Sequence, residues 1–281
     1  MDKTKRRNTL LICIVMLAAV VVGIIFTQPY SVHHESIQEA MRDAVLHDVN
    51  KIGVFGIAVD PSLASGFVVT AVLLFIALLI RIFAIPKFKF VPGKFQLLIE
   101  EWVGIFDRLA KGNSPHRNRA LGAYIFAAGS YIFTGTMFEL FGIQGITTEG
   151  HSISLPAPLA NINGAIAMGC FSYLFIMFGG LTSNGGKGVL GTLKEFSLPL
   201  SMTFRLFGAL LSGMLTTELV YYFITLSFVL PVLVGVLFTV LHALIQAYVL
   251  TMLTSVYYGE VTEKHEKKPK KKKVEAEAAG A

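Results

Sequence analysis

The sequence has little charge for its length. Only 15% of its 281 residues are charged, whereas 54% are hydrophobic and the mean hydropathy is +0.64. A soluble domain of this length needs more charged residues on its surface, so the composition argues against an ordinary soluble protein. Its long apolar runs point instead to a chain that crosses a membrane several times.

Cysteine is scarce, and the common catalytic motifs are missing. Both cysteines, Cys13 and Cys170, lie inside apolar runs, which favours buried free thiols over a disulfide. The sequence contains no CxxC, HExxH, GxxxxGK[ST] or GxSxG pattern. We therefore expect no catalytic residue, no cofactor and no metal ligand in this chain.

The apolar runs are long enough to form membrane-spanning helices. They cover residues 9–27, 64–85, 120–143, 162–181, 196–225 and 231–258. As helices the last two are ~40–45 Å long, whereas the hydrocarbon core is ~30 Å thick, so they must be steeply tilted or broken. We predict an all-α membrane protein with five or six transmembrane helices, the last two forming a long, strongly tilted hairpin.

Basic residues are unevenly distributed between the loops. Residues 86–119 carry seven Lys or Arg and residues 183–194 carry two, whereas residues 144–160 carry none. The tail contains the run KKPKKKK. By the positive-inside rule, the basic loops and the C-terminus face the cytoplasm. The net charge of +6 then reflects membrane orientation, and we expect no nucleic-acid partner.

Composition divides the chain into four parts. Residues 1–27 fit either an uncleaved signal-anchor or a cleaved leader, and cleavage would leave five spans with the N-terminus outside. Residues 28–63 form an outer segment and residues 64–258 the transmembrane domain. Residues 259–281 are a lysine-rich cytoplasmic tail with the composition of a disordered segment. Within the domain, apolar spacing predicts an amphipathic helix over residues 94–110 at the inner surface.

One arginine lies deep in the fifth apolar run. Arg205 is about nine residues into that run, too far for its side chain to reach the interface easily. Placing an arginine at mid-membrane costs ~2.5–3.5 kcal/mol on insertion scales. Such residues usually face a bundle interior, a water-filled cavity or a partner charge, although a structural ion pair is an alternative.

The helix that carries this arginine is predicted to have two polar faces. At 100° per residue, a sector of ~60° contains a polar stripe that consists of Ser201, Arg205, Ser212 and Thr216. The small residues Gly208 and Ala209 flank the stripe and would let a neighbouring helix approach closely. Glu218 lies on the opposite side, together with Met214 and Tyr221.

Other polar residues are candidates for a site within or beside the membrane. Glu218 is either an ion relay or a group at the outer interface, and His242 is either a relay or a satisfied buried histidine. Gln246 lies one turn after His242 and is expected to hydrogen-bond the arginine of the adjacent helix. Asn163 suits an outer vestibule or merely a helix start. Glu139 is expected at the outer interface.

The quoted residues resemble a known family. EFSLPLSMTFRLFG, followed by LIQAYVLTMLTSVYYGE in the last helix, resembles subunit a of the rotary F-type ATP synthases, and PLANIN is similar to that family's entrance motif. The resemblance covers residues 64–258. Two positions depart from it: Ala209 stands where Asn is common, and Met214 where Glu or His is common. Glu218, one turn further along, is a candidate replacement, shifted ~6 Å outward.

The resemblance implies a stator subunit that is not an enzyme on its own. It would provide two offset ion half-channels at the c-ring and couple H⁺ or Na⁺ translocation to ATP synthesis. Arg205 would be the gating charge opposite the ring carboxylate, Ser201 and Ser212 would face the ring, and Glu218 would relay ions in the outer half-channel. The implied partners are the c-ring, the peripheral-stalk b subunits, other ATP synthase subunits and membrane lipid, in a bacterial plasma (inner) membrane or an equivalent coupling membrane.

Two other function classes remain open. A secondary transporter would use Arg205 as a substrate or counter-ion site, but it predicts paired repeats with broken helices, and the sequence has no convincing repeat. A structural membrane scaffold would have no ion path. The sequence does not distinguish H⁺ from Na⁺, because the selecting carboxyl lies on another chain.

Overall fold

The structure is a computed structural model, and it describes residues 52–54, 57–146, 148, 152–222 and 230–263. The predicted leader at residues 1–27, most of the outer segment at 28–63 and most of the tail at 259–281 lie outside these residues. The division of the chain into four parts therefore stays a prediction.

The described chain is mainly helical, in agreement with an α-helical membrane protein. Its α-helices are α3 (Pro61–Leu79), α4 (Lys94–Asn113), α5 (Asn118–Phe138), α6 (Ile162–Asn184), α7 (Gly186–Lys194), α8 (Ser197–Tyr222) and α9 (Leu230–Thr262). The sequence did not predict α7, which lies in the loop expected between two spans. α8 and α9 have 26 and 33 residues, or ~39 Å and ~50 Å of helix.

Short irregular elements extend or connect these helices. α3 continues into the π-helical segment η1 (Ile80–Ala84) and the 3-10 turn η2 (Ile85–Lys87), and α5 continues into the 3-10 turn η3 (Glu139–Phe141). Two antiparallel hairpins, which were not predicted, pair β1 (Ile52–Val54) with β2 (Ile57–Val59) and β3 (Gln144–Ile146) with β4 (Ser152–Ser154). The registers place Ile52 opposite Val59 and Gln144 opposite Ser154.

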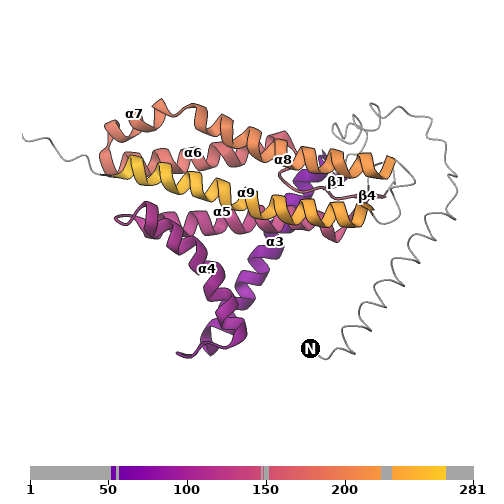
Figure 1. The fold of residues 1–281 in the computed structure, drawn as a ribbon, viewed down its shortest axis with the longest axis horizontal. Helices are drawn as coiled ribbons and strands as arrows, with labels where there is room; N and C mark the ends of the chain where they lie inside the picture. Colours follow the sequence, from indigo (N-terminus) through magenta and orange to yellow (C-terminus); the bar gives the residue numbers. More distant parts are fainter. Residues whose placement is uncertain (1–51, 55–56, 147, 149–151, 223–229, 264–281) are drawn as a thin grey trace, which may run out of the picture.

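Four helices form a bundle, from which two others diverge. α5, α6, α8 and α9 run side by side, and α9 packs against α5, α6 and α8 (Figure 1). α3 and α4 project from one side of this bundle as a V (Figure 1). The bundle core contains the fully buried side chains Leu121, Ile125, Ile132, Ile176, Met202 and Leu206. Cys170, expected to be buried, is instead exposed on α6.

Four helical segments in the described part of the chain are long and apolar enough to cross a membrane. They are Pro61–Lys87, Asn118–Phe141, Ile162–Asn184 and Gly235–Thr262. α8 is not among them, and the side chains of Met214, Thr217 and Glu218 in this helix lie outside the described residues. The prediction of five or six spans, the tilt of α8 and α9, and their hairpin connection at residues 223–229 stay predictions.

α4 has the amphipathic character that the sequence predicted for residues 94–110. It packs against α5 through the buried residues Phe106 and Ala110. Its exposed face carries two ion pairs at 2.6 Å, Arg108 with Glu101 and Lys111 with Asp107. One apolar and one charged face suit a helix at a membrane surface.

Candidate functional site

Arg205 lies on the face of α8 that points away from the bundle. The buried residues of this helix follow a spacing of four and include Leu198, Met202, Leu206 and Leu210. Ser201, Arg205 and Ser212 are all exposed on the other side, and a Cβ added to Gly208 would meet only open space. The polar stripe of the helical wheel is therefore an outward-facing surface of this chain.

Arg205 has no hydrogen bond or ion pair with another described residue. By contrast, two of the three stripe hydroxyls are satisfied within α8: the Ser212 hydroxyl donates to the carbonyl of Ala209 at 2.9 Å, and that of Thr216 to the carbonyl of Ser212 at 2.7 Å. Such bonds suit hydroxyls on a membrane helix, since lipid offers them no partner. Among the described residues, the guanidinium is therefore the charged group of this stripe that remains available to another molecule, beside the exposed Ser201 hydroxyl.

Gln246 lies apart from this surface. Its side chain is 5% exposed, and its neighbours on the buried face of α9 are Ala243, Ala247 and Leu250. Among the described residues, no hydrogen bond joins Gln246 to the exposed Arg205. The expected bond between them stays a prediction.

A crevice on the opposite side of α8 brings two titratable residues together. It lies between α5, η3, α8 and α9 and is lined by Thr136, Glu139, Leu210, Gly213, Phe238, Thr239 and His242. Glu139 and His242 are both half-buried. The open space is about 10 Å³, roughly what one water molecule requires. An acid, an imidazole and a water are the groups that proton relays use.

Close packing positions the histidine in this crevice. The Nδ1 atom of His242 lies 3.6 Å from the position that a Cβ of Gly213 would occupy. The ring centroid of Phe238 lies 5.7 Å from that of His242, with the planes inclined by 36°. Leu210 and Gly213 place this crevice behind the stripe, on the buried side of α8.

The sequence did not predict this pairing. We expected Glu139 at the outer interface, which stays a prediction, and the structure shows that it lines the crevice that also contains His242. The only sequence signal was an acid in the apolar stretch GTMFELFG, and its neighbour lies on a helix near the other end of the chain. Glu218 lies near the end of α8, but its side chain is outside the described part, as are those of Met214 and Tyr221.

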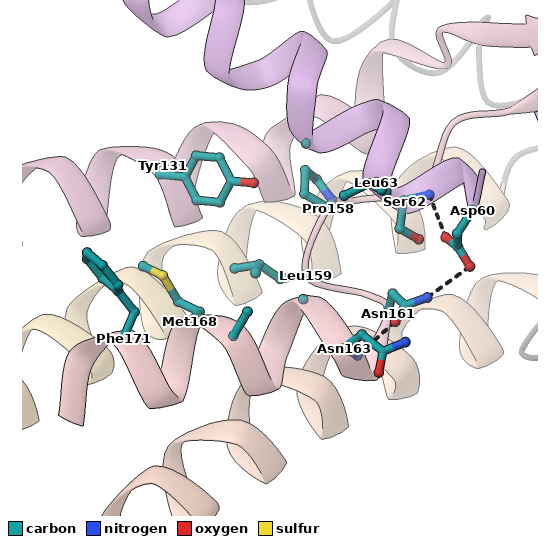
Figure 2. A pocket seen from close by; sticks show the side chains of 13 residues that line it. Asp60, Ser62, Leu63, Tyr131, Pro158, Leu159, Asn161, Asn163, Met168 and Phe171 are labelled. Atoms are coloured by element: carbon teal, nitrogen blue, oxygen red, sulfur yellow. Dashed lines mark hydrogen bonds between the residues drawn. The ribbon is translucent and has the colours of Figure 1, made fainter. Parts of the chain in front are cut away.

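A larger hollow lies where α3 and α6 begin. It measures about 490 Å³, and Asp60, Tyr131, Asn161, Asn163 and Phe171 are among the residues that line it (Figure 2). Two helix caps form its polar rim. The Asp60 carboxylate accepts from the Ser62 amide at 2.8 Å and from the Asn161 side chain at 2.9 Å.

Asn161, and not Asn163, provides the helix cap at this rim. The Asn161 side-chain oxygen accepts from the backbone amide of Asn163 at 2.8 Å, which satisfies a free N–H at the start of α6. The Asn163 side chain is exposed beside the hollow. Its position agrees with the predicted vestibule, and that role stays a prediction.

Comparisons with known proteins agree with the resemblance seen in the sequence. Residues 65–259 match the family model described as ATP synthase A chain. The chain is also similar to ATP synthase subunit a of Sulfurihydrogenibium sp. (strain YO3AOP1), with 26% identity over 208 residues, which are 68% of this chain and 93% of that protein. The family match spans the Arg205 stripe, the Glu139–His242 crevice and all seven described α-helices except the first turn of α3 and the last turn of α9. The chain therefore belongs to the ATP synthase A chain family, whose members are integral membrane, non-catalytic subunits with a role in ion translocation by the Fo sector.

Proposed function

We propose that this chain is the stator that offers two offset ion half-channels to a rotating c-ring, and that it thereby couples H⁺ or Na⁺ translocation to ATP synthesis. The observation that carries the proposal is the exposure of Arg205. A guanidinium on an apolar helix, facing away from its own bundle, requires a partner charge or water outside the bundle. A carboxylate on a ring helix would provide that charge.

Arg205 separates the two half-channels in this proposal. Its positive charge favours the ionised form of each ring carboxyl that passes it and repels a cation that moves directly between the channels. An arginine stays protonated in a low-dielectric site, where a lysine can lose its proton. The membrane potential contributes ~2.3 kcal/mol per charge per 100 mV to the ion's passage.

The surroundings of Arg205 suit a moving ring. Gly208 leaves open space beside the guanidinium, so that a ring helix can approach closely. Ser201 and Ser212 are exposed on the same side, which supports their assignment to the ring-facing surface. Gln246 is buried on α9, and its hydrogen bond with Arg205 remains part of the proposal.

The outer half-channel, in our proposal, lies behind α8 and uses the crevice that contains Glu139 and His242. Gly213, which borders this crevice, lies eight residues beyond Arg205, or ~12 Å further along α8. An ion would enter near Asn163, pass Glu139 and His242, and reach the ring beyond the arginine. Glu139 or Glu218 would then supply the acid that the family commonly has at the position of Met214.

The remaining surfaces supply the partner contacts of the proposal. α3 is buried only at its first turns, and its exposed side chains include Phe67, Leu74, Phe75 and Leu78. Apolar surface of this extent suits lipid and the membrane helices of peripheral-stalk b subunits. The basic end, where α5 begins and α9 ends, faces the cytoplasm of a bacterial inner membrane or an equivalent coupling membrane.

The substitution Arg205→Ala tests the proposal. Because Arg205 has no packing role in the described structure, the complex is expected to assemble but to lose ATP-driven ion pumping and ATP synthesis. Arg205→Lys should fail as well, since its compact head can deprotonate. Arg81→Ala, which removes another exposed arginine from an apolar segment, is the control. Normal pumping by an assembled Arg205→Ala complex would refute the assignment.

A further inference from the structure

Basic side chains gather where α5 begins and where α6 and α9 end. His116, Arg117 and Arg119 are all exposed there. His116 and Arg117 line two hollows of about 480 and 650 Å³ that also share Thr182, and Arg119 lines the smaller one. Among the described residues, no acidic side chain lines either hollow. The site therefore favours an anion.

Arg117 is held in place without using its whole hydrogen-bonding capacity. Its Nη1 atom donates to the hydroxyls of Thr182 at 2.6 Å and Ser183 at 2.8 Å, which ties the start of α5 to the end of α6. No bond among the described residues uses its Nε or Nη2 atom. A guanidinium fixed in this way leaves its Nε–H and Nη2–H donors free on one edge in the described structure. Two parallel N–H donors of this kind match the spacing of two phosphate oxygens.

The smaller hollow becomes apolar away from the basic end. Beyond the arginines it is lined by Ala120, Phe175, Phe178, Gly179 and Tyr258. The Phe175 and Tyr258 rings stack with centroids 5.1 Å apart, and Phe178 is 65% exposed. Phe178 lies six residues before α6 ends, or ~9 Å deeper along the helix.

This polarity follows the expected depth of the membrane. Arg117 and Arg119 lie at the start of the apolar segment Asn118–Phe141, where lipid phosphates meet the hydrocarbon. The aromatic part of the hollow lies beside the same segment, at the depth of acyl chains. A free phosphate would use the arginines but would gain nothing from the apolar part.

We propose that this groove between α5 and α6 binds an anionic phospholipid, with the phosphate at Arg117 and Arg119 and an acyl chain along Ala120 and Phe178. The bound lipid would bridge α5 and α6 and lie against Tyr258 of α9. The proposal uses neither Arg205 nor the crevice, so it stands independently of the proposed ion path.

Photoactivatable phosphatidylglycerol and phosphatidylcholine with identical acyl chains test the proposal on the complete, detergent-solubilised complex. Mass spectrometry then identifies the labelled peptides. Phosphatidylglycerol should label the peptides that contain Ala120 and Phe178 more strongly than phosphatidylcholine does. One basic side chain at a membrane surface changes anionic-lipid binding about fivefold, so Arg119→Gln should lower this labelling about fivefold.

Arg119→Gln is the decisive variant, because Arg119 makes no hydrogen bond within the described structure and its loss leaves the Thr182 and Ser183 contacts intact. Arg81→Gln, the matched control, should leave the labelling unchanged. Equal labelling by the two lipids, or an unchanged signal in Arg119→Gln, would overturn the proposal. Loss of labelling in excess inorganic phosphate would also overturn it, by assigning the site to a free anion.

Discussion

Replacing the two titratable residues of the crevice, singly and together, tests whether they act in one ion path. The variants are Glu139→Gln, His242→Gln and the double replacement. Glutamine keeps a polar side chain in the crevice but cannot exchange a proton at physiological pH. Because one crevice contains both residues and has room for about one water, an ion that uses either group should use the other.

The expected loss of ion flux depends on whether Glu139 and His242 act one after the other in a single path. Loss of a positioned proton donor or acceptor slows proton transfer by ~10²–10⁴-fold. A water can occupy part of the space left by either group, so we expect a loss near the lower limit, about hundredfold for each single variant. Independent effects would multiply to about ten-thousandfold. For two members of one path, the double variant should be about as slow as the slower single variant, a coupling of ~2.7 kcal/mol.

Passive ion flux through the reconstituted membrane sector, driven by an imposed potential, is the measurement. Glu260→Gln provides the control, because Glu260 is an exposed acid on α9 outside the crevice. Unchanged flux in Glu139→Gln and His242→Gln would refute the relay. Multiplicative losses in the double variant would show that the two groups do not share a path.

Three further predictions follow from α8 and from the packing of α6. Glu218→Gln should slow ion movement without uncoupling the motor, and unchanged flux with unchanged pH dependence would make Glu218 merely interfacial. A cysteine at the exposed Ser212 should cross-link to the ring helix that carries the carboxyl, whereas one at the buried Leu206 should not; the reverse pattern would mean that α8 is turned the other way. Gly179→Ala should destabilise the fold by about 1–3 kcal/mol, since its Cβ would overlap a tyrosine ring, whereas Gly186→Ala has open space around it and should be neutral in thermal unfolding.

The sequence placed Ser201, Arg205 and Ser212 on one polar stripe of α8, and all three are exposed in the structure. The opposite face was predicted from side chains that lie outside the described residues, so that part stays a prediction. Local geometry explains the placement of the stripe, because a helix turns 100° per residue whatever surrounds it. Ser201, Arg205 and Ser212 therefore had to lie within a sector of ~40° on this helix. The amphipathic α4 and the helices over residues 64–85, 120–143 and 162–181 follow from similarly local patterns, and their bounds in the structure differ by only a few residues at most ends.

Contacts between distant segments were decided by the tertiary structure. Periodicity gives the direction of a side chain relative to its own helix, but it does not give the identity of the neighbouring helix. Glu139 was therefore expected at the interface, and its neighbour His242 was invisible until α5 and α9 were seen to pack together. Likewise, Gln246 has the polarity of a partner for Arg205, yet the packing of α9 buries it on a different surface.

What the sequence by itself determined is the membrane class, the polar stripe around Arg205 and the likeness to subunit a, because apolar length, helical period and a motif are all local properties of the chain. Only the tertiary structure decided that the stripe is exposed, that an acid and an imidazole share a crevice behind it, and that Asp60 and Asn161 join the starts of α3 and α6. Each of these depends on how separate helices pack, and packing is set by the shapes of many side chains acting together.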